Sequence, residues 1–246
     1  MLACKYTNQG GRQYNEDNCT AMKRKSMLCA VMADGLGGHG GGAKASEAAV
    51  EVIKENFRQL SDLERVSREQ FDSWFEQAND SVVALQTADC QMKTTLAILC
   101  ANEENGRAVW AHLGDSRIYH FIDGKEVFCT FDHSVSRMAV LAGEITLDEV
   151  RFHKDRSKLL KVVGVEELPR PEFGSCTLEK EFDHAFLLCT DGFWEYVTEE
   201  EMEQTLQTSE TPEEWLKKMC HVLRTKVSGD NDNNSAVAIF FREEER

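Results

Sequence analysis

Carboxylates follow apolar runs at three places in the sequence. Asp34 comes after VMA, Asp115 after AHLG and Asp191 after FLLCT, and each stands directly before a glycine or a serine. Two more, Asp230 and Asp232, lie in GDNDNNS just before the last apolar run. Carboxylates that gather at one end of a sheet repel one another unless cations neutralise them or some stay protonated. Oxygen ligands without Cys or His suit Mg²⁺ or Mn²⁺. The pattern therefore predicts a site for such cations, although Asp before Gly is also an ordinary turn signal.

Residues 31–42, VMADGLGGHGGG, place six glycines and one histidine around the first of these carboxylates. Glycine allows a positive φ and lets a ligand approach the main chain closely, so this stretch either makes a turn or holds a ligand. It is no Walker loop, and it does not open a dinucleotide site with a later acidic ribose ligand in a βαβ unit. The sequence also lacks Cys-x5-Arg, GxSxG and HExxH. Arg12 adds a planar guanidinium that suits phosphate or carboxylate, although an isolated arginine is more often a surface residue.

The elements that must position these side chains are short apolar runs and longer helical patterns. The runs expected to form strands are MLACKYT, DNCTAMK, SMLCAVMA, TTLAILCA, RAVWAHLG, SRIYHFI, KEVFCTF, HAFLLCT and SAVAIFF. Helical spacing of apolar residues runs from Ala45 to Leu60 and from Ser67 to about Ala88. A third helix is expected after the cap formed by Thr211 and Pro212. This order predicts an α+β fold with sheets in the middle and helices outside. Because no Pro/Gly/Ser-rich linker interrupts it, we expect a single domain over residues 1–246.

Composition limits the partners and the compartment. The chain has 246 residues, 41% of them hydrophobic, and a formal net charge of -15. Such acidity argues against nucleic acid or an anionic membrane as partners. No run of about 18 apolar residues and no signal-peptide core is present. Nine cysteines at irregular spacing argue against a disulfide framework. We therefore expect reduced thiols and a cytoplasmic location.

Eight segments in order resemble the motifs of one enzyme family: GGRQYNED, VMADGLGGHGGG, TTLAILC, HLGDSRIYHF, FDHSV, AGEITLDEVRFHKDRSKLLKVVG, LLCTDGFWEYV and DNDNNSAVAIF. They resemble the metal-dependent serine/threonine protein phosphatases of the 2C class (the PPM family) in its bacterial form, from about residue 5 to 241. The resemblance implies a central β-sandwich of two mostly antiparallel sheets flanked by α-helices, with the metal site at one edge. It also implies hydrolysis of phosphoserine and phosphothreonine in proteins by a metal-activated water. Two Mn²⁺ or Mg²⁺ ions per chain, and a third at a weaker site, are the expected cofactors. The expected partners are phosphorylated proteins, such as kinases or their targets, and the expected state is a monomer.

The resemblance also assigns roles to individual residues. Asp34 resembles the carboxylate that bridges two metals, and the Gly35 carbonyl resembles a further ligand. Asp191 and Asp232 resemble ligands of the other metal, and Asp115 resembles a ligand of a third, weaker one.

The remaining roles concern the substrate and water. Arg12 matches the arginine that holds the substrate phosphate. Glu16 and Asp17 match acidic residues that hydrogen-bond metal-bound waters. Many eukaryotic members have a histidine general acid where this chain has Leu36. His39, three residues on, is a possible proton donor, and a metal-bound water is the alternative.

Other departures concern the surroundings of the site. Lys93 stands where the family has a glycine, so the entrance of its strand is expected to be altered. His133 and His153 match family positions in or near a mobile flap, about residues 134–170, and are expected to make structural hydrogen bonds without binding metal. The flap is expected to form part of the rim of the substrate groove.

Two other functions share this pattern. A catalytically weak relative would use the same fold as a sensory or scaffolding module, and a small-phosphoester phosphatase would share the site and differ only in its groove. Retention of the repulsive carboxylates Asp34, Asp191 and Asp232 favours an enzyme, because a scaffold has no use for them.

Overall fold

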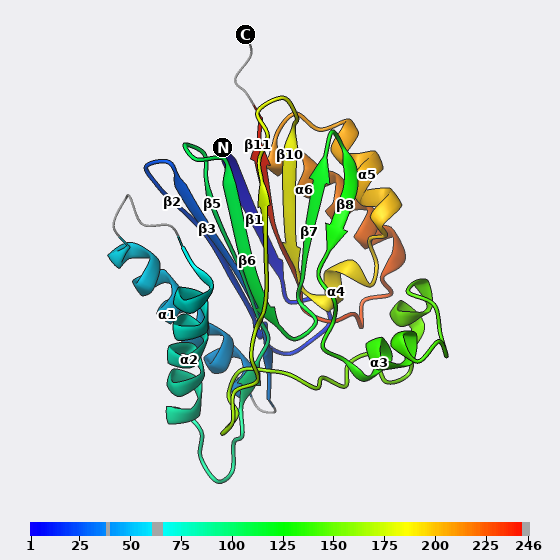
Figure 1. Ribbon diagram of the computed structural model, residues 1–246. Coiled ribbons are helices and arrows are strands. Elements are labelled where there is room, and N and C mark those ends of the chain that lie inside the picture. The colour runs from blue at the N-terminus through cyan, green and yellow to red at the C-terminus, as the bar shows by residue number, and fades with distance from the viewer. Residues whose placement is uncertain (38–39, 61–65, 243–246) are drawn as a thin grey trace.

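Two antiparallel β-sheets pack face to face in the computed structural model, which describes residues 1–37, 40–60 and 66–242 (Figure 1). The first sheet has the order β1 (Leu2–Asn8), β11 (Asn234–Phe241), β10 (His184–Cys189), β7 (Arg117–Ile122) and β8 (Lys125–Cys129). The second has the order β2 (Asp17–Arg24), β3 (Met27–Leu36), β5 (Leu96–Asn102), β6 (Arg107–Leu113) and β9 (Glu172–Thr177), with β4 (Lys93–Thr94) beside β3. The expected β-sandwich is therefore confirmed.

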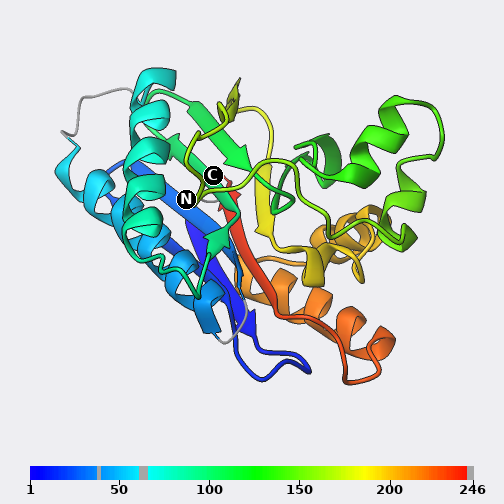
Figure 2. The ribbon, with the colours of Figure 1, turned by 90° about the horizontal axis from the view of Figure 1, so that it is seen from below.

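Helices cover the outer face of each sheet. α1 (Gly41–Gln59) and α2 (Arg68–Ala84) lie on one side, and α5 (Glu199–Gln207) and α6 (Pro212–Lys226) lie on the other (Figures 1 and 2). Three hydrophobic layers result, one between the sheets and one under each pair of helices. Successive residues of β3 alternate between two of these layers, because side chains point to opposite faces of a strand. Burial on both faces explains why the strands read as continuous apolar runs.

The helix boundaries follow local capping. The side chain of Ser67 accepts a hydrogen bond from the Gln70 main-chain N–H, and the side chain of Gln70 accepts one from the Ser67 N–H, so α2 begins with a capping box. Thr211 caps α6 with Pro212 at its first position, as the sequence predicted. The predicted extension of α2 to about Ala88 is wrong, because the helix ends at Ala84 and residues 87 and 90 then exchange two main-chain hydrogen bonds in a turn.

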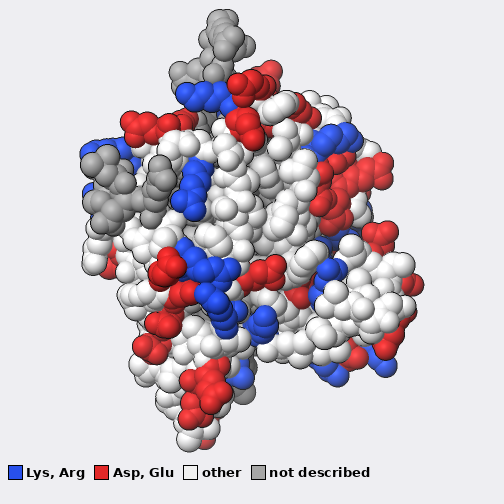
Figure 3. All heavy atoms as spheres, viewed as in Figure 1, with Lys and Arg blue, Asp and Glu red and all other residues white. Residues whose placement is uncertain are grey.

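Residues between β8 and β9 form a lobe beside the sandwich. It contains α3 (Val135–Leu141) and a 3₁₀ helix, η2 (Asp148–Phe152), and it lies on the side away from α1 and α2 (Figure 2). Its surface is mostly uncharged in the view of Figure 3, and Met138, Leu141 and Phe152 are exposed on it. The chain returns to the sandwich through a bridge between Val163 and Thr94 of β4. None of the described helices has the length and apolarity to cross a membrane.

Candidate metal centre

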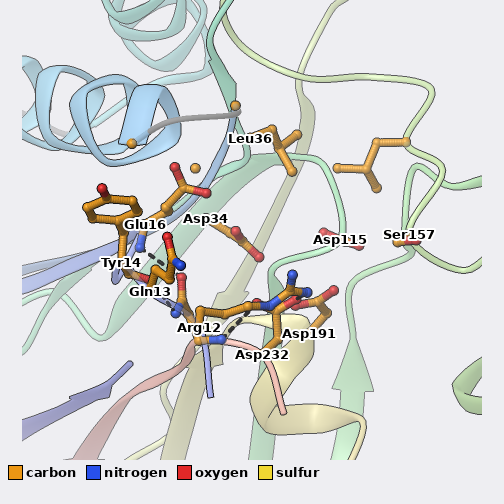
Figure 4. A pocket seen from close by; sticks show the side chains of 15 residues that line it. Arg12, Gln13, Tyr14, Glu16, Asp34, Leu36, Asp115, Ser157, Asp191 and Asp232 are labelled. Carbon is orange, nitrogen blue, oxygen red and sulfur yellow. Dashed lines mark hydrogen bonds and ion pairs between the residues drawn. The ribbon is translucent and has the colours of Figure 1, made fainter. Parts of the chain in front are cut away.

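Four aspartates line one cavity of about 650 Å³ at an end of the sandwich (Figure 4). They come from separate parts of the chain: Asp34 from β3, Asp115 from the turn between β6 and β7, Asp191 from the start of α4 (Asp191–Trp194), and Asp232 from the residues before β11. The structure thus brings together all four side chains that the sequence predicted as ligands. The fifth acid of the pattern, Asp230, is not among the cavity residues.

Asp34 is held by main-chain and side-chain bonds from the neighbouring β4–β5 segment. Its N–H donates to Thr95 Oγ1 at 2.9 Å, and its carbonyl accepts from the Thr95 N–H at 2.8 Å and from Thr94 Oγ1 at 2.9 Å. Burial raises the pKa of the Asp34 carboxyl well above its usual value, and the charge of Asp17, its partner across β2 and β3, raises it further. An uncompensated carboxylate is therefore unfavourable here.

The loops that carry Asp191 and Asp232 are packed main chain against main chain. A Cβ on Gly192 would lie 2.0 Å from the Asn233 carbonyl oxygen, so only glycine fits between them. The Gly192 N–H donates to Asp191 Oδ1 at 2.6 Å, and the Asn233 N–H donates to Asp232 Oδ1 at 2.8 Å. Burial, followed by the charges of Glu195 and Asp232, raises the pKa of Asp191 to about 7.

The glycines after Asp34 allow β3 and the start of α1 to touch. A Cβ on Gly35 would lie 2.1 Å from the Gly42 carbonyl oxygen, and a Cβ on Gly42 would lie 2.5 Å from the Gly35 carbonyl carbon. Gly40, which precedes α1, has a φ of 77°. His39, the possible proton donor, lies outside the described residues, and the side chain of Leu36 points toward the cavity (Figure 4).

The two acids of β2 and the loop before it approach the same cavity. Glu16 lines it and accepts the Gly42 N–H at 3.0 Å. Asp17 is buried; Thr190 Oγ1 donates to its Oδ2 at 3.0 Å, whereas its Oδ1 has no hydrogen-bond partner among the described residues. Burial is the main cause that raises the pKa of Asp17 to about 7.

Arg12 lies at the open side of the cavity. Its Nη2 is 2.6 Å from Asp232 Oδ2, and the two side chains are 59% and 42% exposed. That hydrogen bond is the main cause that raises the pKa of Arg12. The guanidinium thus reaches the rim of the acidic cavity while it remains accessible to a ligand.

Asp115 completes the cavity from the turn between β6 and β7, which connects the two sheets. Its carboxyl is buried, and both burial and the charge of Asp191 raise its pKa well above the usual value. The indole N–H of Trp194 donates to the Asp115 carbonyl at 2.9 Å, and the guanidinium of Arg117 stacks 3.5 Å from that Trp194 ring. The position of Asp115 therefore depends on packing beneath the cavity.

The donor set fits hard divalent cations. Every side chain that faces inward as a candidate ligand offers oxygen, and divalent cations offset both the burial and the mutual repulsion that raise the pKa values of Asp34 and Asp191. The unpartnered Oδ1 of Asp17 is a further acceptor for water in such a centre. Asp34, Asp191 and Asp232 could hold two Mn²⁺ or Mg²⁺ ions, and Asp115 could hold another.

The role of Asn233 in the site was not found from the sequence. The side chain of Asn233 accepts the Glu16 N–H at 2.8 Å and donates to the Gln9 and Tyr14 carbonyls, so it fixes the loop that carries Arg12. The only signal in the sequence was its place next to Asp232.

The flap and β4 also contribute to the surroundings of the cavity. Ser157 and Leu159, within the segment predicted as a flap, line the cavity. Lys93 pairs with Leu36 in the β3–β4 ladder, so a lysine at this position is compatible with strand pairing.

Comparisons with known proteins agree on one family. A family model described as protein phosphatase 2C matches residues 7–232. A serine/threonine phosphatase, Stp, of Listeria monocytogenes is 29% identical over 238 residues, which cover 93% of this chain and 90% of that one. The protein phosphatase PhpP of Streptococcus pneumoniae is 31% identical over 196 residues, 78% of this chain and 77% of its own length. The solved structure of the catalytic domain of the serine/threonine protein phosphatase PstP, in complex with two manganese ions, superposes with a TM-score of 0.80 at 24% identity over 97% of both chains.

Proposed function

Because the chain belongs to the protein phosphatase 2C family, we propose that it hydrolyses phosphoserine and phosphothreonine in proteins with two Mn²⁺ or Mg²⁺ ions held by its acidic cavity. The chain is a protein serine/threonine phosphatase. The family model covers residues 7–232, which supports one catalytic domain over the whole chain.

One observation carries the metal assignment. Four aspartates from four separate segments line one cavity, and burial, followed by the charges of neighbouring carboxylates, raises the pKa values of Asp34, Asp115 and Asp191. A scaffold gains nothing from carboxylates that repel one another, whereas a centre for divalent cations needs them as ligands. The two manganese ions in the related PstP structure support the number and the kind of ion.

Asp34 would bridge the two ions, since it lines the cavity and the charges of Asp191, Asp115 and further carboxylates act on it. Asp191 and Asp232 would complete the ligand set together with the Gly35 carbonyl, whose oxygen would lie 2.6 Å from a Cβ on Gly42. When bound, the ions would supply the Lewis acidity that activates a water and orients it toward phosphorus.

Arg12 would bind the phosphoryl oxygens. Its guanidinium is accessible and can form two parallel hydrogen bonds to a phosphate. In this structure the same group is paired with Asp232, so ligation of Asp232 by a cation and release of Arg12 toward the substrate would go together. Glu16 and Asp17 would accept hydrogen bonds from water in the cavity and so hold it in place.

The leaving seryl or threonyl oxygen needs a proton. Leu36 supplies none, and we propose His39 or a water of the centre as the donor.

The test is hydrolysis of a phosphothreonine peptide and of p-nitrophenyl phosphate after EDTA treatment, with Mn²⁺ or Mg²⁺ restored. We expect activity to vanish with EDTA, to return with Mn²⁺, and to fall by orders of magnitude in Asp191→Asn. Asp80→Asn, an exposed replacement on α2, is the matched control and should keep full activity. A folded protein that stays inactive with either ion, or that hydrolyses the peptide in EDTA, would contradict the proposal.

A further inference from the structure

Three side chains with metal-binding chemistry meet outside the acidic cavity. His112 is near the end of β6, His133 precedes α3 and Glu172 opens β9, and one ligand atom of each lies within 4.8 Å of the others. His112 and Glu172 are directly opposite in the β6–β9 pairing. His133 Nε2 lies 3.5 Å from Glu172 Oε2, longer than a good hydrogen bond.

Two buried ring nitrogens of this cluster have no hydrogen-bond partner in the part of the chain that the structure describes: His112 Nδ1 and His133 Nε2. His112 is 1% exposed, and the side chain of His133 is 9% exposed. His112 Nε2 lies 2.9 Å from the Phe131 carbonyl, which places the ring proton on Nε2 and leaves a lone pair on Nδ1. Burial lowers the pKa of His112 to about 4, so the ring is neutral and able to act as a ligand at pH 7.

A second pair of stacked histidines shows the contrast. His120 Nε2 and His184 Nδ1 are hydrogen-bonded at 3.0 Å, and His184 Nε2 pairs with the Glu179 carbonyl at 3.0 Å. The ring nitrogens that face each other there are satisfied by the protein. Buried polar groups in proteins are normally paired in this way. In the first cluster His112 Nδ1 therefore needs a partner, and His133 Nε2 has only the long contact with Glu172.

We propose that His112, His133 and Glu172 bind one Zn²⁺ ion. Two imidazoles and a carboxylate suit zinc, with a fourth position left for water, and differ from the all-oxygen set of the acidic cavity. The sequence pattern predicted only a structural hydrogen bond for His133, and it gave no role to His112 or Glu172.

Zinc uptake requires a small rearrangement. The two rings stack with centroids 4.7 Å apart and 19° between their planes, whereas ligand atoms on tetrahedral zinc lie about 3.3 Å apart. The rings must therefore tilt, and the Glu172 side chain, 47% exposed, must turn inward. The Gly114 N–H donates to His133 Nδ1 at 3.2 Å, so the neutral ring holds its proton on Nε2. Binding at Nε2 moves that proton to Nδ1 and breaks the bond from Gly114.

The cluster lies at both ends of the segment 134–170, so an ion bound there would affect the position of that segment. His133 stands just before the segment 134–170 and Glu172 just after it, and that segment supplies Ser157 and Leu159 to the acidic cavity. Zinc would fasten both ends of the segment to β6. It would also act on Gly114, the residue before Asp115.

The test is equilibrium dialysis of the EDTA-treated Asp191→Asn protein against Zn²⁺, with zinc per chain determined by atomic absorption. Asp191→Asn removes one carboxylate of the acidic cavity and so weakens ion binding there. Because zinc binding is measured directly, the result does not depend on whether the protein is an active phosphatase. We expect one Zn²⁺ per chain, a dissociation constant raised at least about tenfold by Glu172→Gln, and loss of the site in His133→Ala. Glu179→Gln, beside the satisfied histidine pair, is the matched control and should bind zinc normally.

Co²⁺ substitution identifies the ligands. Visible absorption of four-coordinate Co²⁺ without thiolate charge-transfer bands would support the two imidazoles and the carboxylate. Because Glu172 is partly exposed, Glu172→Gln should fold even if the buried histidine variants do not. Zinc uptake that is unchanged by Glu172→Gln and His133→Ala, thiolate bands in the cobalt spectrum, or no uptake at all would overturn the proposal.

Discussion

Replacing Asp191 by asparagine tests whether the acidic cavity is repulsive when it holds no cation. Asp191 is half-buried in the cavity beside other carboxylates, and its Oδ1 accepts a hydrogen bond from the Gly192 N–H, which an asparagine oxygen can also accept. The replacement therefore removes a charge with little change of shape. We expect the metal-free Asp191→Asn protein to be more stable than the wild type at neutral and alkaline pH, while its activity is lost.

The magnitude follows from the pKa. In the unfolded chain the carboxyl has a pKa near 3.8, and in the folded chain it is raised to about 7. Between these values the folded state holds a proton that the unfolded state has released, so the free energy of unfolding falls as pH rises. With about 1.4 kcal/mol per pKa unit, ionisation costs the folded state about 1.7 kcal/mol at pH 5 and about 4 kcal/mol at pH 8. The advantage of Asp191→Asn should thus grow by about 2.5 kcal/mol between pH 5 and pH 8.

The assay is thermal unfolding followed by circular dichroism after EDTA treatment, at pH 5 and pH 8. For a chain of this size the growth in stability corresponds to a relative rise in Tm of about 5–10 °C. Addition of Mn²⁺ should reverse the order, because two cations, each at about 100 times its Kd, together add about 5.4 kcal/mol to the wild type, which exceeds the advantage of about 4 kcal/mol at pH 8. Asp80→Asn, exposed on α2, controls for the loss of one charge and should show no pH-dependent difference.

Two results would refute this reasoning. One is a stability difference between Asp191→Asn and wild type that stays constant from pH 5 to pH 8 without metal. The other is an Mn²⁺ stabilisation of equal size in both proteins, which would mean that the cations bind elsewhere.

Three further replacements test separate parts of the site. Arg12→Ala should raise KM for a phosphopeptide about tenfold or more and change the free energy of unfolding by less than about 1 kcal/mol, because its pair with Asp232 is exposed; a normal KM would remove Arg12 from phosphate binding. Gly35→Ala places a Cβ 2.1 Å from the Gly42 carbonyl oxygen, a main-chain atom that cannot turn away, and should abolish Mn²⁺ binding in calorimetry; normal binding would show that this close contact is not needed. Thr95→Val removes a buried hydroxyl that accepts a main-chain N–H of β3 and should lower the free energy of unfolding by about 1–3 kcal/mol in denaturant titration; an unchanged value would mean that this bond does not position the strand.

Much of the fold could be predicted because burial on both faces produces continuous apolar runs. β9 was missed for a clear reason: Gly174 lies under the ring of Trp110, where a Cβ would come within 2.5 Å, so the strand has a glycine in place of an apolar side chain. α5 was missed because only Met202 and Leu206 of its nine residues are buried. In the sequence, neither of these two segments can be told from a loop.

The candidate ligands could be predicted because each carboxylate stands at the end of an apolar run or just before one. The residues that hold these ligands in place could not be predicted, because their hydrogen bonds join segments that are distant in the sequence. Thr95 and Asn233 are ordinary polar residues until β5 lies beside β3 and the last loop lies beside residues 9–16. The histidine cluster was missed for the same reason, because His112 and Glu172 meet only through the pairing of β6 with β9.

Anomalous X-ray diffraction from crystals grown with Mn²⁺ tests the central claim most directly. The account predicts two manganese peaks in the acidic cavity, both bound to Asp34, with Asp191, Asp232 and the Gly35 carbonyl as the other protein ligands. An empty cavity with manganese elsewhere in the chain, or a cavity in which no manganese peak contacts Asp34, would contradict it.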